Sequence, residues 1–192
     1  MATTKSKTTT KSKTTKSKTA KSTTTKANAL TTWGKIWRLA LAIAIPLGGG
    51  FLISLLTRNA MDQFGMFKQP PLAPPAWLFP VAWTILYVLM GIASYLIYLK
   101  LRHGNKSTKT FARTALIIYG VQLILNFLWT PLFFNANLYW FAFGILLAMW
   151  ALEIALLVFA FKVSKPAFWC LIPYLLWTTF AAYLNISIAI LN

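Results

Sequence analysis

The sequence predicts an all-α integral membrane protein, a bundle of five transmembrane helices, and three observations carry this prediction. Of the 192 residues, 58% are hydrophobic and 16% are aromatic, whereas only 11% are charged. A soluble globular domain carries about 25% charged residues. The apolar residues also fall into five runs of about twenty, the length that crosses the hydrocarbon core of a bilayer. The alternation of apolar and polar residues that marks a transmembrane barrel is absent, so helices are the expected elements.

Residues 1–32 form a separate segment, which we expect to be a disordered tail rich in Lys, Thr and Ser. The chain has 19 basic residues, and lysines are frequent in this segment, while no large apolar residue stands between Met1 and Leu30. Such a segment cannot bury enough apolar surface to offset its ordering entropy. A solvated tail is the first interpretation, and a polybasic arm held on anionic lipid is the second. Nucleic acid is not an expected partner, because no aromatic residue is interleaved with the lysines for base stacking.

The second expected domain, residues 33–192, contains the five spans. Their connections are short, apart from a long proline-rich stretch at Arg58–Ala76 and a strongly basic loop at Lys100–Thr110. Each span is long enough to cross a bilayer as a helix. The expected helices lie near Ile36–Thr57, Trp77–Leu99, Phe111–Thr130, Leu138–Phe161 and Ala167–Ile190.

The positions of the basic residues predict the orientation of the chain, since cytoplasmic loops carry an excess of Lys and Arg. The tail, the basic stretch Lys100–Arg113 and the turn Lys162–Lys165 alternate with connections that carry little or no net charge. We therefore expect the N-terminus in the cytoplasm and the chain in a bacterial plasma membrane. The mitochondrial outer membrane is the alternative location.

The second span opens with "APPAWLFPVAW", in which prolines and tryptophans are unusually dense. Pro74 and Pro75 are tolerated at a helix entrance, where the first amide groups have no intrahelical partner. Further along, Phe79, Trp83 and Tyr87 are spaced four residues apart and so share one helical face. This face is either ordinary packing between helices or an aromatic wall for a flat apolar ligand.

Three other spans carry similar faces that combine indoles, small residues and amides. Amide side chains inside a bilayer are expected to face other helices or a cavity. Together the stripes predict a mostly apolar pocket with a few hydrogen-bonding groups. Their members are Gln122, Asn126 and Trp129 in the third span, Trp140, Phe143, Gly144 and Leu147 in the fourth, and Trp177, Ala181, Leu184 and Asn185 in the fifth.

Three segments, in this order, resemble the TspO/MBR family, whose members are also called tryptophan-rich sensory proteins, translocator proteins or peripheral benzodiazepine receptors. They are "QPPLAPPAWLFPVAWTILYVLMGIASYLIY", "LNFLWTPLFF" and "PYLLWTTFAAYLN", and the likeness spans roughly residues 36–192. The resemblance implies a five-helix membrane receptor or sensor, often a homodimer. It also implies binding of porphyrins such as protoporphyrin IX, for sensing, sequestration or transport. In many members cholesterol and synthetic isoquinoline or benzodiazepine ligands are implied as well.

The same resemblance implies a set of ligand-binding residues and shows two departures from the family. Leu72 stands where the family's loop usually carries a tryptophan. The final segment "LNISIAILN" lacks the tyrosine and the basic residue of the proposed cholesterol-recognition pattern, so cholesterol binding is not expected. Gly48 and Gly49 match the small residues of the first helix. The implied ligand-binding residues are Phe79, Trp83, Tyr87, Asn126, Trp129, Trp140, Leu147, Trp177, Ala181 and Leu184.

The inventory of reactive side chains argues against most enzyme classes. His103 is the single histidine and Cys170 the single cysteine, so we expect neither a metal site nor a cofactor. Only Asp62 and Glu153 carry carboxylates, which disfavours acid–base hydrolysis by a carboxylate pair. The alternative to a receptor is an enzyme that degrades porphyrins with light and oxygen. The resemblance then implies Trp83 and Trp177 as its catalytic residues.

Glu153 requires its own explanation, because a carboxylate within a membrane span is costly. It follows Trp140 by thirteen residues and so lies about 220° around the helix from that indole. We expect a structural role for Glu153, protonated or hydrogen-bonded to a neighbouring helix or subunit. A small proton-coupled transporter that uses Glu153 is the remaining alternative.

Overall fold

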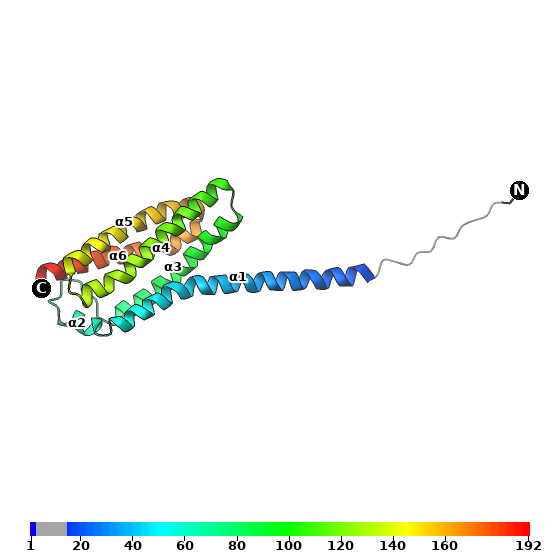
Figure 1. Ribbon diagram of the computed structural model, residues 1–192. Helices are drawn as coiled ribbons and strands as arrows, with labels where there is room; N and C mark the ends of the chain where they lie inside the picture. Colours follow the sequence, from blue (N-terminus) through cyan, green and yellow to red (C-terminus); the bar gives the residue numbers. More distant parts are fainter. Residues whose placement is uncertain (3–14) are drawn as a thin grey trace. The chain divides into compact units, whose positions relative to one another are not determined.

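The computed structural model describes the backbone of residues 1–2 and 15–192, with the side chains of residues 1–2 and 32–192 (Figure 1). In these described residues the fold is all-α, and five of the helices are long and apolar enough to cross a membrane. The predicted fold class and the five predicted spans are therefore confirmed. The helices are α1 (Thr15–Leu56), α2 (Ala60–Met66), α3 (Leu78–His103), α4 (Lys106–Phe134), α5 (Tyr139–Val163) and α6 (Lys165–Leu191).

The chain divides into two units, Met1–Arg38 and Leu39–Asn192, and α1 contributes to both. The predicted disordered tail, residues 1–32, falls in the first unit. Its residues 3–14 lie outside the described residues, and from Thr15 the backbone is helical as the beginning of α1. The second unit contains the helix bundle.

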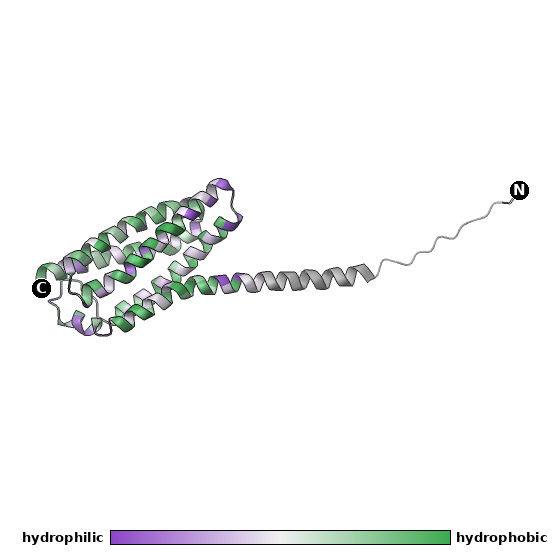
Figure 2. Cartoon of the chain, in the orientation of Figure 1, coloured by the Kyte–Doolittle hydropathy of each residue, from purple (hydrophilic) through white to green (hydrophobic). Residues whose placement is uncertain are grey.

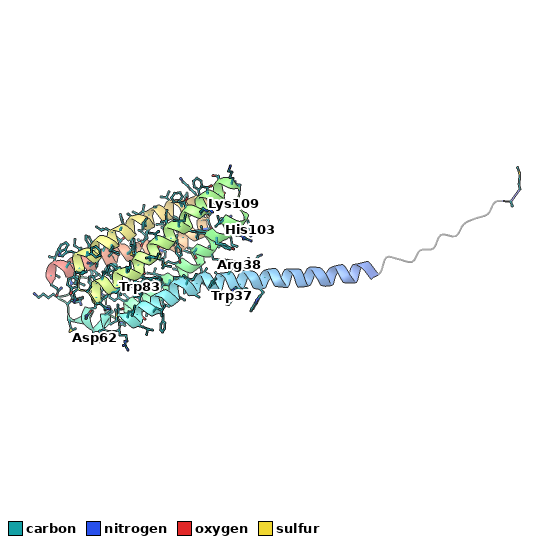
Figure 3. The ribbon with its side chains drawn as sticks, viewed as in Figure 1. Trp37, Arg38, Asp62, Trp83, His103 and Lys109 are labelled. Atoms are coloured by element: carbon teal, nitrogen blue, oxygen red, sulfur yellow. The ribbon has the colours of Figure 1, made fainter. Side chains whose placement is uncertain are left out.

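The helices extend beyond the apolar spans at their basic ends. The third span was predicted to start at Phe111, whereas α4 begins at Lys106, after the side chain of Asn105 accepts a hydrogen bond of 2.9 Å from the amide of Thr108. Such an N-cap satisfies an amide that has no intrahelical partner. Residues with long basic side chains can also remain in the helix while their charged ends reach the membrane surface. Figure 3 shows His103 and Lys109 at the end of the bundle opposite Asp62.

Small side chains allow α3, α4, α5 and α6 to pack closely. Alanines on these helices are fully buried, as expected where helices approach closely inside a membrane. The helices of the bundle are largely apolar along their length, and hydrophilic residues gather at the α3–α4 turn (Figure 2). The fully buried alanines are Ala93, Ala112, Ala115, Ala142, Ala160 and Ala167.

The second unit also contains the C-terminal part of α1, which is much less buried than the other helices. Only 6% of its most apolar stretch is buried, against 44% for α3. One close approach brings α1 against α3, because a Cβ atom added at Gly91 would lie 2.5 Å from the Cα atom of Ile43. Only a glycine permits this contact without a shift of the backbone.

The long connection between α1 and α3 contains the short helix α2, which the sequence analysis did not predict. Ala60 and Phe64, four residues apart, are both buried. The rings of Phe64 and Phe79 pack edge to face with their centroids 4.7 Å apart. The connection is held to α6 at two points. The hydroxyl of Tyr183 donates to the Pro71 carbonyl at 2.5 Å, and the amide of Lys68 donates to Oδ1 of Asn192 at 2.9 Å.

Candidate functional site

A cavity of about 560 Å³ lies between α1, α2, α3 and α4. Its volume is within the range of about 300–1,000 Å³ that is typical of small-molecule sites. Most of its lining is apolar or aromatic, with hydroxyl groups at several points. The lining residues are Leu47, Gly50, Phe51, Ile53, Ser54, Thr57, Arg58, Ala60, Met61, Phe79, Pro80, Trp83, Thr84, Tyr87, Trp129, Thr130 and Phe134.

One wall of the cavity is the aromatic face of α3. The structure brings Phe79, Trp83 and Tyr87 together there, as their spacing predicted, and Trp83 is among the labelled side chains of Figure 3. The indole of Trp83 stacks on the Tyr87 ring with centroids 5.4 Å apart. It also meets the ring of Trp177 edge-on at 6.4 Å. The orientation of Trp83 is thus set by aromatic rings on both sides.

Behind this wall a buried chain of hydrogen bonds leads away from the cavity. The Tyr87 hydroxyl donates to Oδ1 of Asn126 at 2.7 Å, and Nδ2 of Asn126 donates to the Tyr174 hydroxyl at 3.0 Å. Nε2 of Gln122 donates to the same Tyr174 hydroxyl. Asn126 therefore holds a cavity-lining tyrosine in place without itself lining the cavity.

The chain continues to Glu153, which is 2% exposed. The Thr178 hydroxyl donates to its Oε2 atom at 2.5 Å, and Nε2 of Gln122 lies 3.4 Å from its Oε1 atom. These partners come from α6 and α4, so the expected hydrogen bonding of Glu153 to neighbouring helices is confirmed. Buried polar groups in a bilayer require such partners.

Trp129, on α4, also lines the cavity. Its indole Nε1 donates to Oδ1 of Asn185 at 2.9 Å, and Nδ2 of Asn185 donates to the carbonyl of Tyr139 at 2.9 Å. Its ring stacks on Phe133 with centroids 5.4 Å apart. The hydrogen bond and the stacking fix the face that Trp129 presents to the cavity.

The other residues that the resemblance implied lie away from the lining. Trp177 is half-buried behind Trp83, and its indole nitrogen has no hydrogen-bond partner among the described residues. Ala181 and Leu184 are buried in the core between helices. Trp140 and Leu147 are 61% and 45% exposed on the outer face of α5.

The reason for this placement on α5 is the position of its polar residue. Glu153 requires hydrogen-bond partners, so the side of α5 that carries it turns toward α4 and α6. Ala142, Leu146 and Met149 share that buried side. Trp140 and Leu147 are on the other side of the helix, which is exposed.

Several cavity residues were missed by the sequence analysis, including Phe51, Met61, Phe134 and Arg58. Phe51 lies in an α1 stretch that is apolar on all sides, where periodicity does not distinguish a cavity face from a lipid face. Met61 and Arg58 lie in or beside the unpredicted helix α2. Phe134, the last residue of α4, lies just beyond the predicted span.

The lining of the cavity is made of apolar, aromatic and hydroxyl-bearing side chains and one cation. Among the described residues no three His, Cys, Asp or Glu side chains are grouped as a metal site requires. The cavity lining includes no carboxylate and no histidine. What the lining offers is aromatic rings for stacking, hydroxyls at several points and one cation, Arg58.

Comparison with known proteins gives consistent matches. The model of the TspO/MBR family matches residues 42–191. The chain is 35% identical over 160 residues to "Tryptophan-rich protein TspO" of Chlorobaculum tepidum, covering 82% of this chain and 98% of that protein. It is 38% identical over 142 residues to "Translocator protein" of Ovis aries, covering 73% and 82%. It is 35% identical over 156 residues to "Tryptophan-rich sensory protein" of Cereibacter sphaeroides, covering 81% and 92%.

Proposed function

The chain belongs to the TspO/MBR family and is an integral membrane protein, and from this premise we propose that it is a receptor for porphyrins or similar flat apolar molecules. Protoporphyrin IX is the proposed ligand, and sensing, sequestration or transport is the proposed use of binding. Relatives called a sensory protein and a translocator protein support a role of this kind.

The observation that carries the proposal is the aromatic cavity. A flat macrocycle gains most from stacking on rings that are already oriented, because little side-chain entropy is then lost on binding. Trp83 and Trp129 are both held in place by neighbouring rings, and Trp129 is also hydrogen-bonded. The volume of about 560 Å³ provides space for one small molecule.

The test is a titration of the detergent-purified protein with protoporphyrin IX in the dark, followed by the absorbance of the porphyrin. We expect saturable binding that Trp83→Ala weakens about 10-fold, which corresponds to about 1.4 kcal/mol. Trp169→Ala is the matched control, because Trp169 is 67% exposed and does not line the cavity. Binding that is non-saturable, or equally weakened by both substitutions, would contradict the proposal.

A second candidate function, light-dependent degradation of porphyrins, is favoured by the contact between Trp83 and Trp177. Trp83 lines the cavity and Trp177 meets it edge-on at 6.4 Å. An indole beside a photoexcited porphyrin can donate one electron to it, and the reduced porphyrin passes that electron to molecular oxygen, which leaves an oxidised Trp83 and superoxide that can attack the macrocycle. An electron from Trp177 would move the oxidised site from Trp83 to Trp177.

Illumination of the protein–porphyrin complex in air tests this candidate. Loss of the porphyrin absorbance should be slowed by Trp177→Phe, while binding in the dark remains within about 2-fold of wild type because Trp177 does not line the cavity. An unchanged rate of loss in the variant that lacks both Trp83 and Trp177 would leave the receptor function alone.

We also propose that the basic end of the bundle lies in the cytoplasm of a bacterium, which the charge at the α3–α4 turn supports. Single cysteines placed at Ser107 and at Asn137, in a Cys170→Ser background, can be treated with a membrane-impermeant thiol reagent in whole cells. Labelling at position 137 alone is expected. Labelling at position 107 alone would reverse the orientation.

A further inference from the structure

Arg58 lies where two cavities meet. It follows the end of α1 and precedes α2, and it is the one charged residue in the lining of the aromatic cavity. It also lines a second cavity of about 380 Å³, whose other residues are Leu55, Leu56, Asn59, Gln63 and Asn135. The aromatic space therefore adjoins a polar space, and Arg58 is the residue common to both linings.

Arg58 is exposed, and its guanidinium group is unpaired among the residues that the structure describes. No acidic side chain lies within ion-pair distance of Arg58 and no hydrogen bond engages it within the part of the chain that the structure describes. Asp62, on α2, is exposed. An arginine keeps its charge at all relevant pH values, and its five N–H donors match a carboxylate in a two-point arrangement.

Amide groups extend the polar character of the second cavity. Asn59 is exposed, and Asn135 uses its Nδ2 atom to donate to the Leu56 carbonyl at 3.0 Å. The second hydrogen of an amide NH2 group can donate to another acceptor. A ligand with a flat apolar body and an acidic edge fits this pair of spaces. The body would stack in the aromatic cavity while the acidic edge reached the polar one.

We propose that Arg58 is a specificity-determining residue that binds a carboxylate of the ligand, so that the site selects flat apolar molecules with an acidic edge. This inference rests on the proposed function and names the class of ligand more narrowly. Protoporphyrin IX belongs to this class because it carries two propionate groups on one side of its ring. An uncharged macrocycle of the same size does not belong to this class.

The experiment compares protoporphyrin IX with its dimethyl ester, which has the same ring and no charge. Both are titrated in the dark, in a non-ionic detergent, into the wild type and the variants Arg58→Gln, Arg58→Lys and Lys68→Gln. Lys68 is the matched control, because it is an exposed cation of the same connection that lines neither cavity.

We expect the wild type to bind the acid about 10-fold more tightly than the ester, as one charge-assisted hydrogen-bonded pair allows. Arg58→Gln should remove this preference and leave the affinity for the ester within 2-fold. Arg58→Lys should keep part of it, since Lys retains the charge without the planar fork. Lys68→Gln should keep the whole preference for the acid. Added salt should weaken binding of protoporphyrin IX but not of its dimethyl ester.

Two results would overturn the inference while leaving the receptor function intact. One is equal affinity of the wild type for acid and ester. The other is an Arg58→Gln variant that loses both ligands equally, with an unchanged thermal unfolding midpoint. If neither porphyrin binds saturably to the wild type, the proposed function fails, and the inference fails with it.

Discussion

The two sides of α3 differ in how they are held together. On the side of α4, α5 and α6, buried polar groups are joined by hydrogen bonds that converge on Tyr174 and Glu153. On the side of α1 the contacts are apolar, only 6% of the apolar stretch of that helix is buried, and a cavity remains. Specific polar bonds fix the spacing of helices, whereas apolar contacts with a loosely packed helix leave space that a ligand can occupy.

The largest effect is expected where α1 touches α3. Gly91→Leu should lower the free energy of unfolding by about 3 kcal/mol, because even a Cβ atom there would meet the backbone of α1 at Ile43. SDS titration in mixed micelles measures this change. Gly144→Leu is the control, since a Cβ atom at that position meets nothing within 4 Å and its effect should be small. Equal effects of the two substitutions would show that α1 is not packed at Gly91.

A somewhat smaller effect is expected from breaking the polar side. Asn126→Leu removes the acceptor of the Tyr87 hydroxyl and a donor to Tyr174. The free energy of unfolding should therefore fall by about 2 kcal/mol. The same SDS titration applies. Thr114→Val is the control on the same helix, because the Thr114 hydroxyl bonds only to Thr110 within its own helix. If the control costs as much as Asn126→Leu, the bonds between helices contribute little to stability.

Two substitutions of Glu153 differ in effect, since one can preserve its hydrogen bonds and the other cannot. Glu153→Gln keeps an oxygen for the Thr178 hydroxyl and should change the unfolding free energy by less than about 1 kcal/mol. Glu153→Leu leaves that hydroxyl without its partner on α5 and should cost about 2 kcal/mol. If Glu153→Gln lowered the free energy of unfolding as much as Glu153→Leu, the negative charge itself would stabilise the bundle.

The smallest effect is expected on the outer face of α5. Replacing Trp140 and Leu147 together by alanine should change the affinity for protoporphyrin IX by less than about 2-fold, because both side chains are exposed and neither lines the cavity. The dark titration measures this affinity. A loss of 10-fold or more would instead place the ligand on the outer face of α5.

Much of the fold could be predicted from sequence because span length and charge placement are local properties. Each predicted span coincides with a helix, and the aromatic face of Phe79, Trp83 and Tyr87 was read from a spacing of four residues. Helix α2 was missed, because its seven residues are too few to produce a clear period. Arg58 was missed as a candidate ligand contact for the same reason, since it lies in the connection that α2 organises.

The sequence alone is enough to predict that the chain crosses a membrane as five helices, which residues share each helical face, and which family the chain resembles. These follow from composition and from the 3.6-residue period of a helix. The three-dimensional fold is needed to know which faces turn inward, that α1 completes a cavity, and that Arg58 lines both this cavity and a polar one. The physical reason is that an apolar side chain is equally well solvated by lipid and by another helix, so its inward or outward position depends on the neighbours it meets.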